Sequence, residues 1–395
     1  MLFNNIAYLD ENCRIQTGKY IAVRGKTIDY IGGRAPAALP GERVYAGQGR
    51  LLLPGFFNAH SHTPMSLLRG YGEDMVLYDW LQQRIFPFEE RLNDKDVYWA
   101  TLLGCLEMLR YGIVGACDMY MRGDAMARGF LDGGVKANLS VGTAGFDDTP
   151  FDDLPQAAET RAMVENYHNA DDGRLRIEYS LHAEYTSSEK LARSLAAAAA
   201  RDNLAVHVHA AETRAEAEGC RERRDGHSPV RYLADCGLFD VPATAAHCVH
   251  IDDADIAILA EKGVNVATCP KSNLKLASGV CPAGALLAAG VNLALGTDSV
   301  ASNNNLNFIE EMRVFSLLHK GISLDPRLIT PAEALHAATA AGARAQRRGD
   351  CGVIRVGARA DLVALDIDQP HWRPGHNLLH DLIFAADGGD ILLTM

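Results

Sequence analysis

The sequence lacks a long apolar run, and it shows no sign of a membrane or secretion segment. No apolar run approaches the ~20 residues that a membrane-spanning helix needs, and the longest uniform stretch is the alanine run 196–200. The first five residues, 1–5, do not combine a charged segment with an apolar one, so we expect no secretion signal. A membrane is therefore not an expected partner.

Closely spaced cysteines are also missing. The chain has nine cysteines in 395 residues, and none of them stands in a Cys-x-x-Cys pair. An odd, scattered set of this kind predicts free thiols in a reducing cytoplasm. A zinc ribbon and a disulfide scaffold are both excluded.

Basic side chains are in deficit. The 50 acidic and 38 basic side chains give a formal net charge of −12. This balance argues against nucleic acid or an anionic membrane surface as the main partner, because both bind clustered lysine and arginine. The arginine-rich segment 221–224 contains an acid, and we expect it to be a solvated helix face.

Several catalytic motifs are absent as well. No Gly-x-Gly-x-x-Gly and no phosphate-binding loop follows a predicted strand, which argues against a nucleotide-binding open sheet. The sequence has no His-Glu-x-x-His, so a zincin protease is excluded. It also lacks the His-x-Glu with a later Pro-Cys-x-x-Cys that marks another zinc deaminase fold.

What the sequence does contain is an alternation of short apolar runs and helical patterns. The candidate strands are 51–57, 113–118, 137–141, 176–181, 205–209, 243–247, 264–268 and 291–295. Helical spacing follows each of them, for example over 187–201, 252–262 and 305–319. Eight strand–helix units over about 300 residues favour an α/β fold of the (β/α)8 TIM-barrel type over a doubly wound sheet.

The two ends of the chain look different from the middle. Residues 20–24 and 27–31 alternate around a Gly25-Lys26 turn, and 360–366 reads as a further strand. We therefore expect a small β-sandwich domain built from both termini, residues 1–55 and 355–395. The barrel is then expected to span residues 56–354.

Residues that can bind a metal recur at the carboxyl ends of the predicted strands, where barrel enzymes keep their reactive groups. His60 and His62 are two apart on a strand, so both imidazoles point to the same side. His209, His247 and Asp298 end later strands. One strand-end histidine alone is usually structural, but this joint pattern predicts a bound divalent ion.

These residues resemble the amidohydrolase superfamily, and the resemblance covers nearly the whole chain. Loop segments are similar to its methylthioadenosine / S-adenosylhomocysteine deaminase branch: 64–70, 80–81, 87–89, 246–248, 272–276 and 296–303. The resemblance implies an aminohydrolase that converts 6-aminopurine nucleosides to inosine-type products and releases ammonia. Its small-molecule substrate would be a nucleoside, and because this branch often forms dimers or tetramers, a homo-oligomer is expected.

The resemblance also implies the metal ligands, which would be His60, His62, His209 and Asp298. Members with two metals usually carry a lysine or glutamate at the end of strand four, whereas this strand ends in His182. One divalent ion is therefore expected. Imidazole and carboxylate suit Zn²⁺, although Fe²⁺ accepts the same ligands.

Three residues acquire catalytic roles from the resemblance. Glu212 would take a proton from water and pass it to ring N1, although an acid here also suits the start of a helix. His247 would orient the hydroxide and stabilise the tetrahedral intermediate, with direct metal ligation as the alternative. Asp298 would take the remaining proton. His207, one pleat deeper than His209, is expected to be a packed histidine below the site.

Substrate selection is expected to come from loops. Glu89 lies where this branch reads ribose hydroxyls, and a carboxylate can accept two hydroxyl hydrogen bonds. The alternative interpretation is that Glu89 is simply an acid on the protein surface. His182 matches a residue that contacts the purine or ribose. Trp80 could line the pocket or simply pack within its helix.

Two departures from the branch bear on the 5′ group of the nucleoside. Residues 142–148 contain no arginine, whereas members that take S-adenosylhomocysteine usually have arginines near strand three to bind its carboxylate. Glu184 is an additional acid that could favour a cationic or hydroxylated 5′ group. Both departures favour 5′-deoxyadenosine, methylthioadenosine or adenosine over S-adenosylhomocysteine.

Two other functions stay open at this point. One is a deaminase or chlorohydrolase of the same superfamily that acts on a free base, pterin or triazine. Glu89 distinguishes this function from a nucleoside deaminase, because a free base, pterin or triazine has no ribose to bind. The other is a non-catalytic scaffold, but such proteins have lost metal ligands that are all present here.

Overall fold

The computed structural model describes residues 1–37 and 39–395, which divide into two compact units. The first unit contains 1–57, 108–115 and 307–395, and the second contains 58–107 and 116–306. Two strands, β6 (Phe56–Ser61) and β7 (Ile113–Tyr120), run from the first unit into the second. Within the described residues, no helix is both long enough and apolar enough to cross a membrane.

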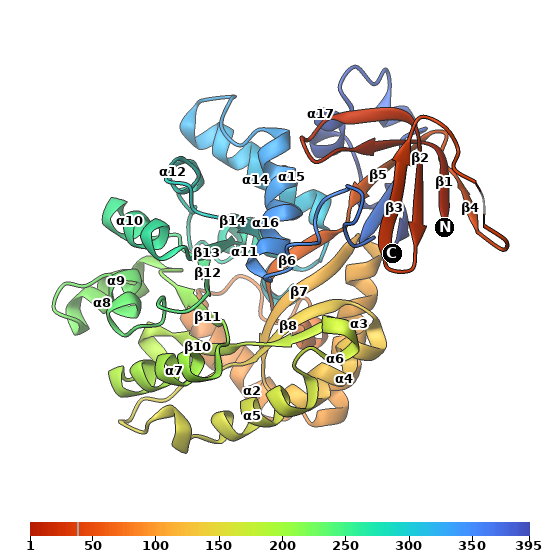
Figure 1. Ribbon diagram of the computed structural model, residues 1–395. Helices are drawn as coiled ribbons and strands as arrows, with labels where there is room; N and C mark the ends of the chain where they lie inside the picture. Colours follow the sequence, from red (N-terminus) through yellow and green to blue (C-terminus); the bar gives the residue numbers. More distant parts are fainter. Residues whose placement is uncertain (38) are drawn as a thin grey trace. The chain divides into compact units, whose positions relative to one another are not determined.

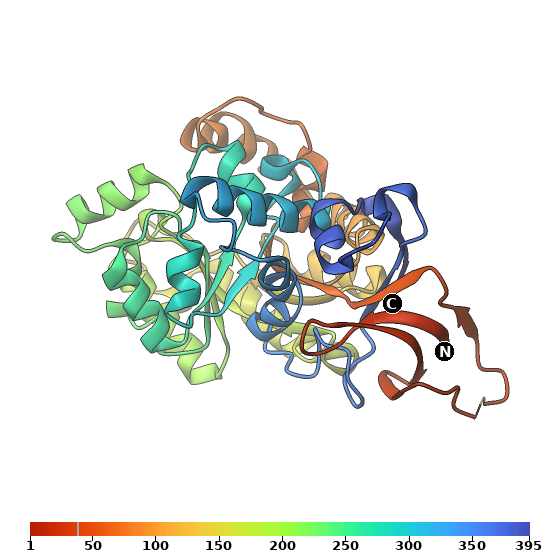
Figure 2. The ribbon, with the colours of Figure 1, turned by 90° about the horizontal axis from the view of Figure 1, so that it is seen from above.

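Both ends of the chain contribute to one seven-stranded sheet in the first unit (Figures 1 and 2). Its strands are β1 (Leu2–Leu9), β2 (Ile15–Arg24), β3 (Thr27–Gly32), β4 (Val44–Ala46), β5 (Arg50–Pro54), β15 (Leu362–Asp366) and β16 (Ile391–Thr394). They follow the order β16-β15-β5-β1-β2-β3, with β4 beside β1. The predicted hairpin at Gly25 is confirmed, because β2 and β3 pair antiparallel around this glycine at φ +62°.

A continuous apolar cluster stabilises this sheet. The members that are fully buried are Phe3, Ile6, Ile21, Ile28, Leu52, Leu362 and Ala364. They come from four sheet strands near the N-terminus and one near the C-terminus, so burial of their side chains joins segments far apart in sequence.

The helices of the first unit belong to the C-terminal third of the chain. They are α14 (Phe308–Ser323), α15 (Pro331–Ala338), α16 (Ala340–Ala345) and α17 (Leu378–Phe384), with short 3-10 turns η5 (Pro370–Trp372) and η6 (Gly388–Asp390). Thr330 and Glu333 form a capping box that begins α15, so two backbone N–H groups that the helix leaves open are bonded.

The strands of the second unit belong to two sheets (Figure 1). The four-stranded sheet has the order β6-β7-β8-β9, with β8 (Lys136–Val141) and β9 (Leu175–Ile177) parallel. The five-stranded sheet is entirely parallel and comprises β10 (Tyr179–Ala183), β11 (Val206–Ala210), β12 (Ala243–His247), β13 (Asn265–Thr268) and β14 (Leu293–Leu295). The predicted α/β class with parallel strands is confirmed.

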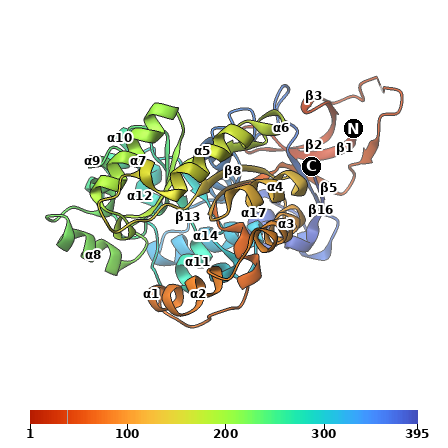
Figure 3. The same cartoon turned by 90° about the horizontal axis from the view of Figure 1, so that it is seen from below.

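Helices connect these strands, and α4 and α5 pack on β8 (Figure 3). The longer ones are α3 (Asp94–Arg110), α4 (Gly123–Gly133), α5 (Pro155–Tyr167), α7 (Glu189–Asp202), α8 (Arg214–Arg223), α9 (Pro229–Asp235) and α10 (Asp253–Lys262). The shorter ones are η1 (Thr63–Leu68), α1 (Leu77–Trp80), η2 (Leu81–Ile85), α2 (Phe86–Glu89), η3 (Phe151–Asp153), α6 (Ala170–Gly173), η4 (Glu184–Thr186), α11 (Pro270–Lys275), α12 (Ala283–Ala288) and α13 (Val300–Asn303).

Two of the predicted strands are each divided in the structure. Residues 51–57 are not one strand, because β5 ends at Pro54 and β6 begins at Phe56. Gly55 separates them: its N–H donates to Asp361 O (2.8 Å), whereas the N–H of Phe56 donates to Gly112 O (2.9 Å). A Cβ at Gly55 would lie 2.5 Å from Val114 Cγ2, so only glycine fits where the chain changes sheets.

The predicted strand 176–181 is also interrupted, at Glu178 between β9 and β10. Short contacts bridge the two sheets on both sides. On one side Thr143 pairs with Leu181 in an isolated parallel bridge. On the other, the N–H of Asp298 donates to His60 O (3.0 Å), so the residues after β14 lie beside β6.

Candidate metal and active site

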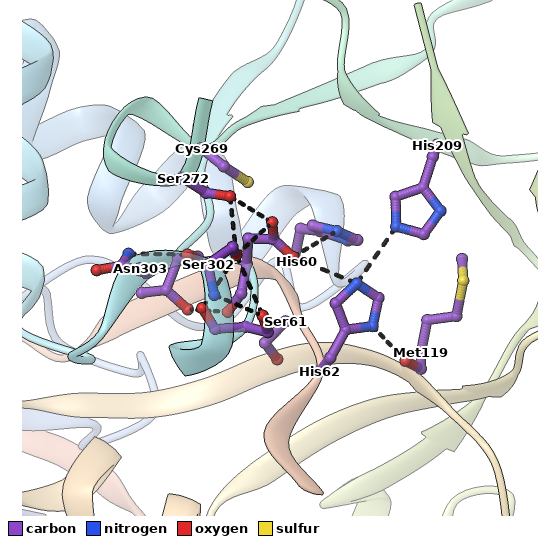
Figure 4. Close-up of polar contacts among 12 residues, drawn as sticks. His60, Ser61, His62, Met119, His209, Cys269, Ser272, Ser302 and Asn303 are labelled. Carbon is purple, nitrogen blue, oxygen red and sulfur yellow. Dashed lines mark hydrogen bonds and ion pairs between the residues drawn. The ribbon is translucent and has the colours of Figure 1, made fainter. Parts of the chain in front are cut away.

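Five predicted site residues meet at the carboxyl ends of strands in the second unit. His60 is in β6, His62 follows it, His209 is in β11, His247 ends β12, and Asp298 follows β14. Figure 4 shows His60, His62 and His209 with their rings turned toward one another. The fold therefore brings together the five residues that the sequence singled out, although His60 lies within β6 and not after a strand 51–57.

The distances within this group are those of a ligand cluster. His62 Nε2 lies 3.3 Å from His209 Nε2 and 3.3 Å from Asp298 Oδ1. His60 Nε2 lies 3.7 Å from the same carboxylate oxygen. Ligand atoms of His60, His62 and His209 all lie within 4.8 Å of one another, as do those of His60, His247 and Asp298.

Each histidine of the cluster is oriented through Nδ1. His62 Nδ1 donates to Met119 O. His209 Nδ1 donates to His182 O (2.7 Å), and His247 Nδ1 donates to Asn273 Oδ1 (2.9 Å). His60 Nδ1 lies 2.9 Å from His207 Nε2. With Nδ1 engaged in this way, Nε2 of each ring is free to face the centre.

One buried nitrogen supports a metal ion at this centre. His60 Nε2 is inaccessible to solvent and has no hydrogen-bond partner among the described residues. Leaving such a group without a partner is costly, and a coordinated cation removes that cost. Three imidazoles and one carboxylate form a donor set that zinc accepts, so the residues present fit a divalent ion.

The electrostatics keep the rings of His60 and His209 neutral, as metal binding requires. Burial, followed by the neighbouring histidines, holds the pKa of His60 and His209 well below the ordinary range. Burial also lowers the pKa of His182 to about 4 and that of His207 to about 3. His207 is thus a neutral, buried ring against His60, as the sequence predicted.

The carboxylate of Asp298 is fixed by two hydroxyls. Ser272 Oγ and Ser302 Oγ donate to its Oδ2, at 2.5 and 2.9 Å, so Oδ1 faces His60 and His62. Asp298 and His247 both have a left-handed backbone conformation, although neither is glycine: φ is +58° at Asp298 and +71° at His247. Such conformations are uncommon outside glycine and concentrate at functional sites.

Glu212 and His247 lie beside each other. His247 Nε2 is 3.9 Å from Glu212 Oε2, and Ser278 Oγ donates to Glu212 Oε1 at 3.5 Å. Burial raises the pKa of Glu212, although the His247 ring opposes that shift. For His247, burial favours the neutral ring, but the charges of Glu212 and Asp298 together raise its pKa.

The four predicted substrate residues differ in their surroundings. Glu89 is buried at the end of α2, and burial raises its pKa, opposed by Tyr120 and His62. The His182 ring lies 5.0 Å from that of His209, centroid to centroid, so it borders the metal cluster. Trp80 is buried at the end of α1.

Glu184 has partners that the sequence did not reveal. It is fully buried, and Arg223 Nη2 and Arg224 Nε donate to its carboxylate at 2.6 and 2.8 Å. The expectation that 221–224 is only a solvated helix face is therefore wrong for two of its arginines. A contact between Glu184 and a substrate would have to compete with both guanidinium groups.

Asp118, at the carboxyl end of β7, is a site residue that the sequence analysis missed. Its Oδ2 accepts hydrogen bonds from Ser61 Oγ and Thr63 N, both at 2.8 Å, and from Thr63 Oγ1. It therefore holds the segment that carries His62. The sequence could have indicated Asp118 by its position, because the predicted strand 113–118 ends at this acid.

A sequence profile of the Amidohydrolase family matches residues 51–395. The chain belongs to the amidohydrolase family. It is 42% identical over 373 residues to a 5-methylthioadenosine/S-adenosylhomocysteine deaminase of Pelotomaculum thermopropionicum, covering 94% of this chain and 85% of that protein. It is 41% identical over 348 residues to a protein of the same name from Dictyoglomus thermophilum, covering 88% and 81%.

Solved structures agree with this assignment. The fold of this amidohydrolase matches the crystal structure of an adenosine deaminase from Xanthomonas campestris with bound zinc, at a TM-score of 0.92 and 32% identity, covering 100% of this chain and 91% of that one. An atrazine chlorohydrolase from Arthrobacter aurescens complexed with zinc matches at a TM-score of 0.89 and 21% identity, covering 99% and 95%. At that identity the second match shows the fold alone.

Proposed function

We propose that this amidohydrolase is a metal-dependent deaminase of 6-aminopurine nucleosides. Water and the C6 amino group are exchanged, so that the products are an inosine-type nucleoside and ammonia. The observation that carries the proposal is the joint position of Glu212 and His247 beside the cluster of His60, His62, His209 and Asp298. The two deaminase-named relatives, at 41–42% identity, support the reaction class.

We propose His60, His62, His209 and Asp298 as the ligands of one divalent ion, most consistent with zinc. When bound, such an ion activates water for attack at neutral pH. The ligand proposal is supported by the Nδ1 contacts of the three histidines, which leave each Nε2 facing the centre.

Proton movement is proposed to depend on two carboxylates. Glu212 takes one proton from the attacking water and delivers it to ring N1 of the purine, which needs a carboxyl group with a raised pKa. Burial supplies that shift. Asp298 takes the second water proton and passes it to the departing amine, so that ammonia leaves as a neutral molecule. His247 already donates from Nδ1 to Asn273, so it would act as an imidazolium, the form that its raised pKa favours, and donate from Nε2 to the oxygen that adds to C6, where negative charge develops.

The same proposal assigns the substrate contacts. Glu89, which is buried at the end of α2, would accept hydrogen bonds from two ribose hydroxyls. His182 would contact the purine or ribose and Trp80 would line the pocket. Glu184 is compensated by two arginines, which weakens its case as the determinant of a cationic 5′ group.

We also propose the finer architecture expected from the sequence. The two parallel sheets would form one (β/α)8 barrel over 56–354, a proposal supported by the bridges on either side of them. Residues 1–55 and 355–395 would form a small β-sandwich domain. A homo-oligomer and a reducing cytoplasmic location remain predictions.

A substrate screen tests the function. Ammonia release is measured with adenosine, 5′-deoxyadenosine, methylthioadenosine and S-adenosylhomocysteine, and with guanine, a pterin and a triazine as non-nucleoside substrates, while zinc and iron are quantified in the same sample. We expect turnover of at least one nucleoside and a metal content near one ion per chain. Turnover of only the non-nucleoside substrates, or of none, contradicts the proposal.

A further inference from the structure

Glu216 bonds directly to the backbone that carries Glu212. It lies in the first turn of α8, and its two carboxylate oxygens accept the N–H groups of Ala211 (2.9 Å) and Glu212 (2.7 Å). Both oxygens are thus used on two consecutive peptide groups. This arrangement fixes the peptide plane immediately before Glu212.

Helix capping alone does not account for this arrangement. Thr213 already caps α8, because its hydroxyl accepts the N–H of Glu216 at 3.1 Å. An acid in the first turn of a helix is normally stabilised while exposed to water. Glu216 is instead buried, at 6% exposure, and none of the ion pairs found in the described residues includes it. Burying a carboxylate without a cation is costly, so the fold retains this acid at some loss of stability.

The segment that Glu216 bonds, Ala211 and Glu212, contains a strained backbone conformation. Ala211 has φ +51°, a left-handed conformation that non-glycine residues seldom adopt. Its carbonyl accepts the N–H groups of Val249 (3.0 Å) and His250 (2.9 Å), which follow β12. The peptide groups around Ala211 are therefore bonded on both sides, to α8 and to the segment after His247.

From this geometry we propose that Glu216 is a positioning residue, which holds the Glu212 carboxyl group in place to move protons at the site. The inference rests on the role proposed above for Glu212. Within the described residues Glu216 has no hydrogen bond or ion pair to His60, His62, His209 or Asp298. It acts through two backbone hydrogen bonds.

The two acids also influence each other electrically. Burial, and then the charge of Glu212, raise the pKa of Glu216 to about 7, while the two backbone N–H groups oppose that rise. The other titratable groups that face Glu216 are His247 at the end of β12, Cys248 after it, Tyr185 after β10, and Cys220 on its own helix. Protonation of Glu216 in the range around pH 7 would weaken the two hydrogen bonds that its carboxylate accepts.

The test replaces Glu216 with glutamine, which keeps the size of the side chain but offers an amide NH₂ to one of the two N–H groups. E216Q is compared with E218Q, which changes an exposed acid of the same helix. Metal content, kcat, KM and the pH profile of kcat are measured on the best nucleoside from the screen, with kcat expressed per metal-loaded chain.

We expect E216Q to keep its metal and to lower kcat about 10-fold to 100-fold with KM changed less than about 2-fold. The acidic limb of its kcat profile should move to lower pH, because the ionisation of Glu216 is gone. E218Q should match the unchanged protein. E216D, which keeps the charge on a shorter side chain, should retain an acidic limb and give an intermediate kcat.

Wild-type kcat and an unshifted acidic limb in metal-loaded E216Q would overturn the inference. If E216Q is too unstable to purify, a wild-type kcat in E216D, with no shift of its acidic limb, overturns it equally. Failure of the proposed function looks different, because in that case the unchanged protein releases no ammonia or E212Q remains active.

Discussion

The seven-stranded sheet and the strand ends of the second unit use burial in opposite ways. The sheet buries side chains such as Phe3, Ile28 and Leu362, whose apolar surfaces gain from leaving water. The strand ends and the helix that follows β11 bury His60, Glu212 and Glu216, each of which loses hydration there. The first arrangement serves stability, whereas the second concentrates polar chemistry at a cost in stability. This contrast can be tested by removing groups from each region.

Metal removal should have the largest effect on the strand ends. Dialysis against a chelator is expected to abolish ammonia release and to lower the melting temperature, because a ligand that binds only the folded state stabilises it. Addition of Zn²⁺ should restore both properties. Chains shown by elemental analysis to be metal-free that still turn over nucleoside would contradict the proposed site.

The second prediction concerns the proton carrier. Glu212→Gln should lower kcat about 10³-fold, since general acid–base groups contribute on the order of 10²–10⁴. Metal content should not change, because Glu212 is not one of the proposed ligands. Stability should be equal or higher, because a buried carboxyl group has been replaced by a neutral amide. E218Q is again the matched control, and activity near wild type would remove Glu212 from the mechanism.

Glu89 provides the third test, which separates a nucleoside enzyme from one that acts on a free base. Glu89→Ala should reduce kcat/KM for the best nucleoside by ~2–3 kcal/mol, about 30-fold to 150-fold, if the carboxylate holds two hydroxyls. The exposed neighbour supplies the control, Glu90→Ala, which should have no effect. A 2′,3′-dideoxynucleoside should lose the same factor in the unchanged protein. Equal turnover by E89A would favour a substrate without ribose.

A smaller effect is expected from the ring behind His60. If His60 binds metal through Nε2, its Nδ1 carries the proton and donates to His207 Nε2, 2.9 Å away. His207→Phe removes this acceptor and should weaken metal affinity about 10-fold to 100-fold in a chelator competition, with little change in kcat at saturating metal. His207→Gln retains an acceptor oxygen and should recover part of the affinity. Unchanged affinity in both variants would show that this contact does not orient His60.

The sheet should show the converse behaviour, and the smallest effect on turnover. Ile28→Ala creates a cavity in its apolar cluster and should lower the free energy of unfolding by ~2–5 kcal/mol. The kcat of the folded, metal-loaded fraction should stay within about 2-fold of wild type. Chemical denaturation and active-site titration measure the two quantities. A large loss of kcat per folded chain would mean that the two regions are not as distinct in role as their compositions indicate.

Particular residues show how far sequence reasoning reached. The strand ends carrying His209 and His247 were predicted within one residue, because apolar runs bounded by helical patterns are strong local signals. The break at Gly55 was missed, because the run 51–57 is continuous in hydropathy and only contacts with Val114 and Asp361 require glycine there. The arginine partners of Glu184 were missed because they lie 39 and 40 residues away along the chain.

The sequence by itself determined the alternation of strands and helices and the same-side placement of His60 and His62, because both follow from the short-range periodicity of the backbone. The tertiary structure alone decided which groups hold these residues in place. Asp118 bonds to the segment around His62, Glu216 bonds to the peptides around Ala211, and His247 and Asp298 adopt left-handed backbones. These features depend on contacts between distant segments and on burial, which local patterns do not encode.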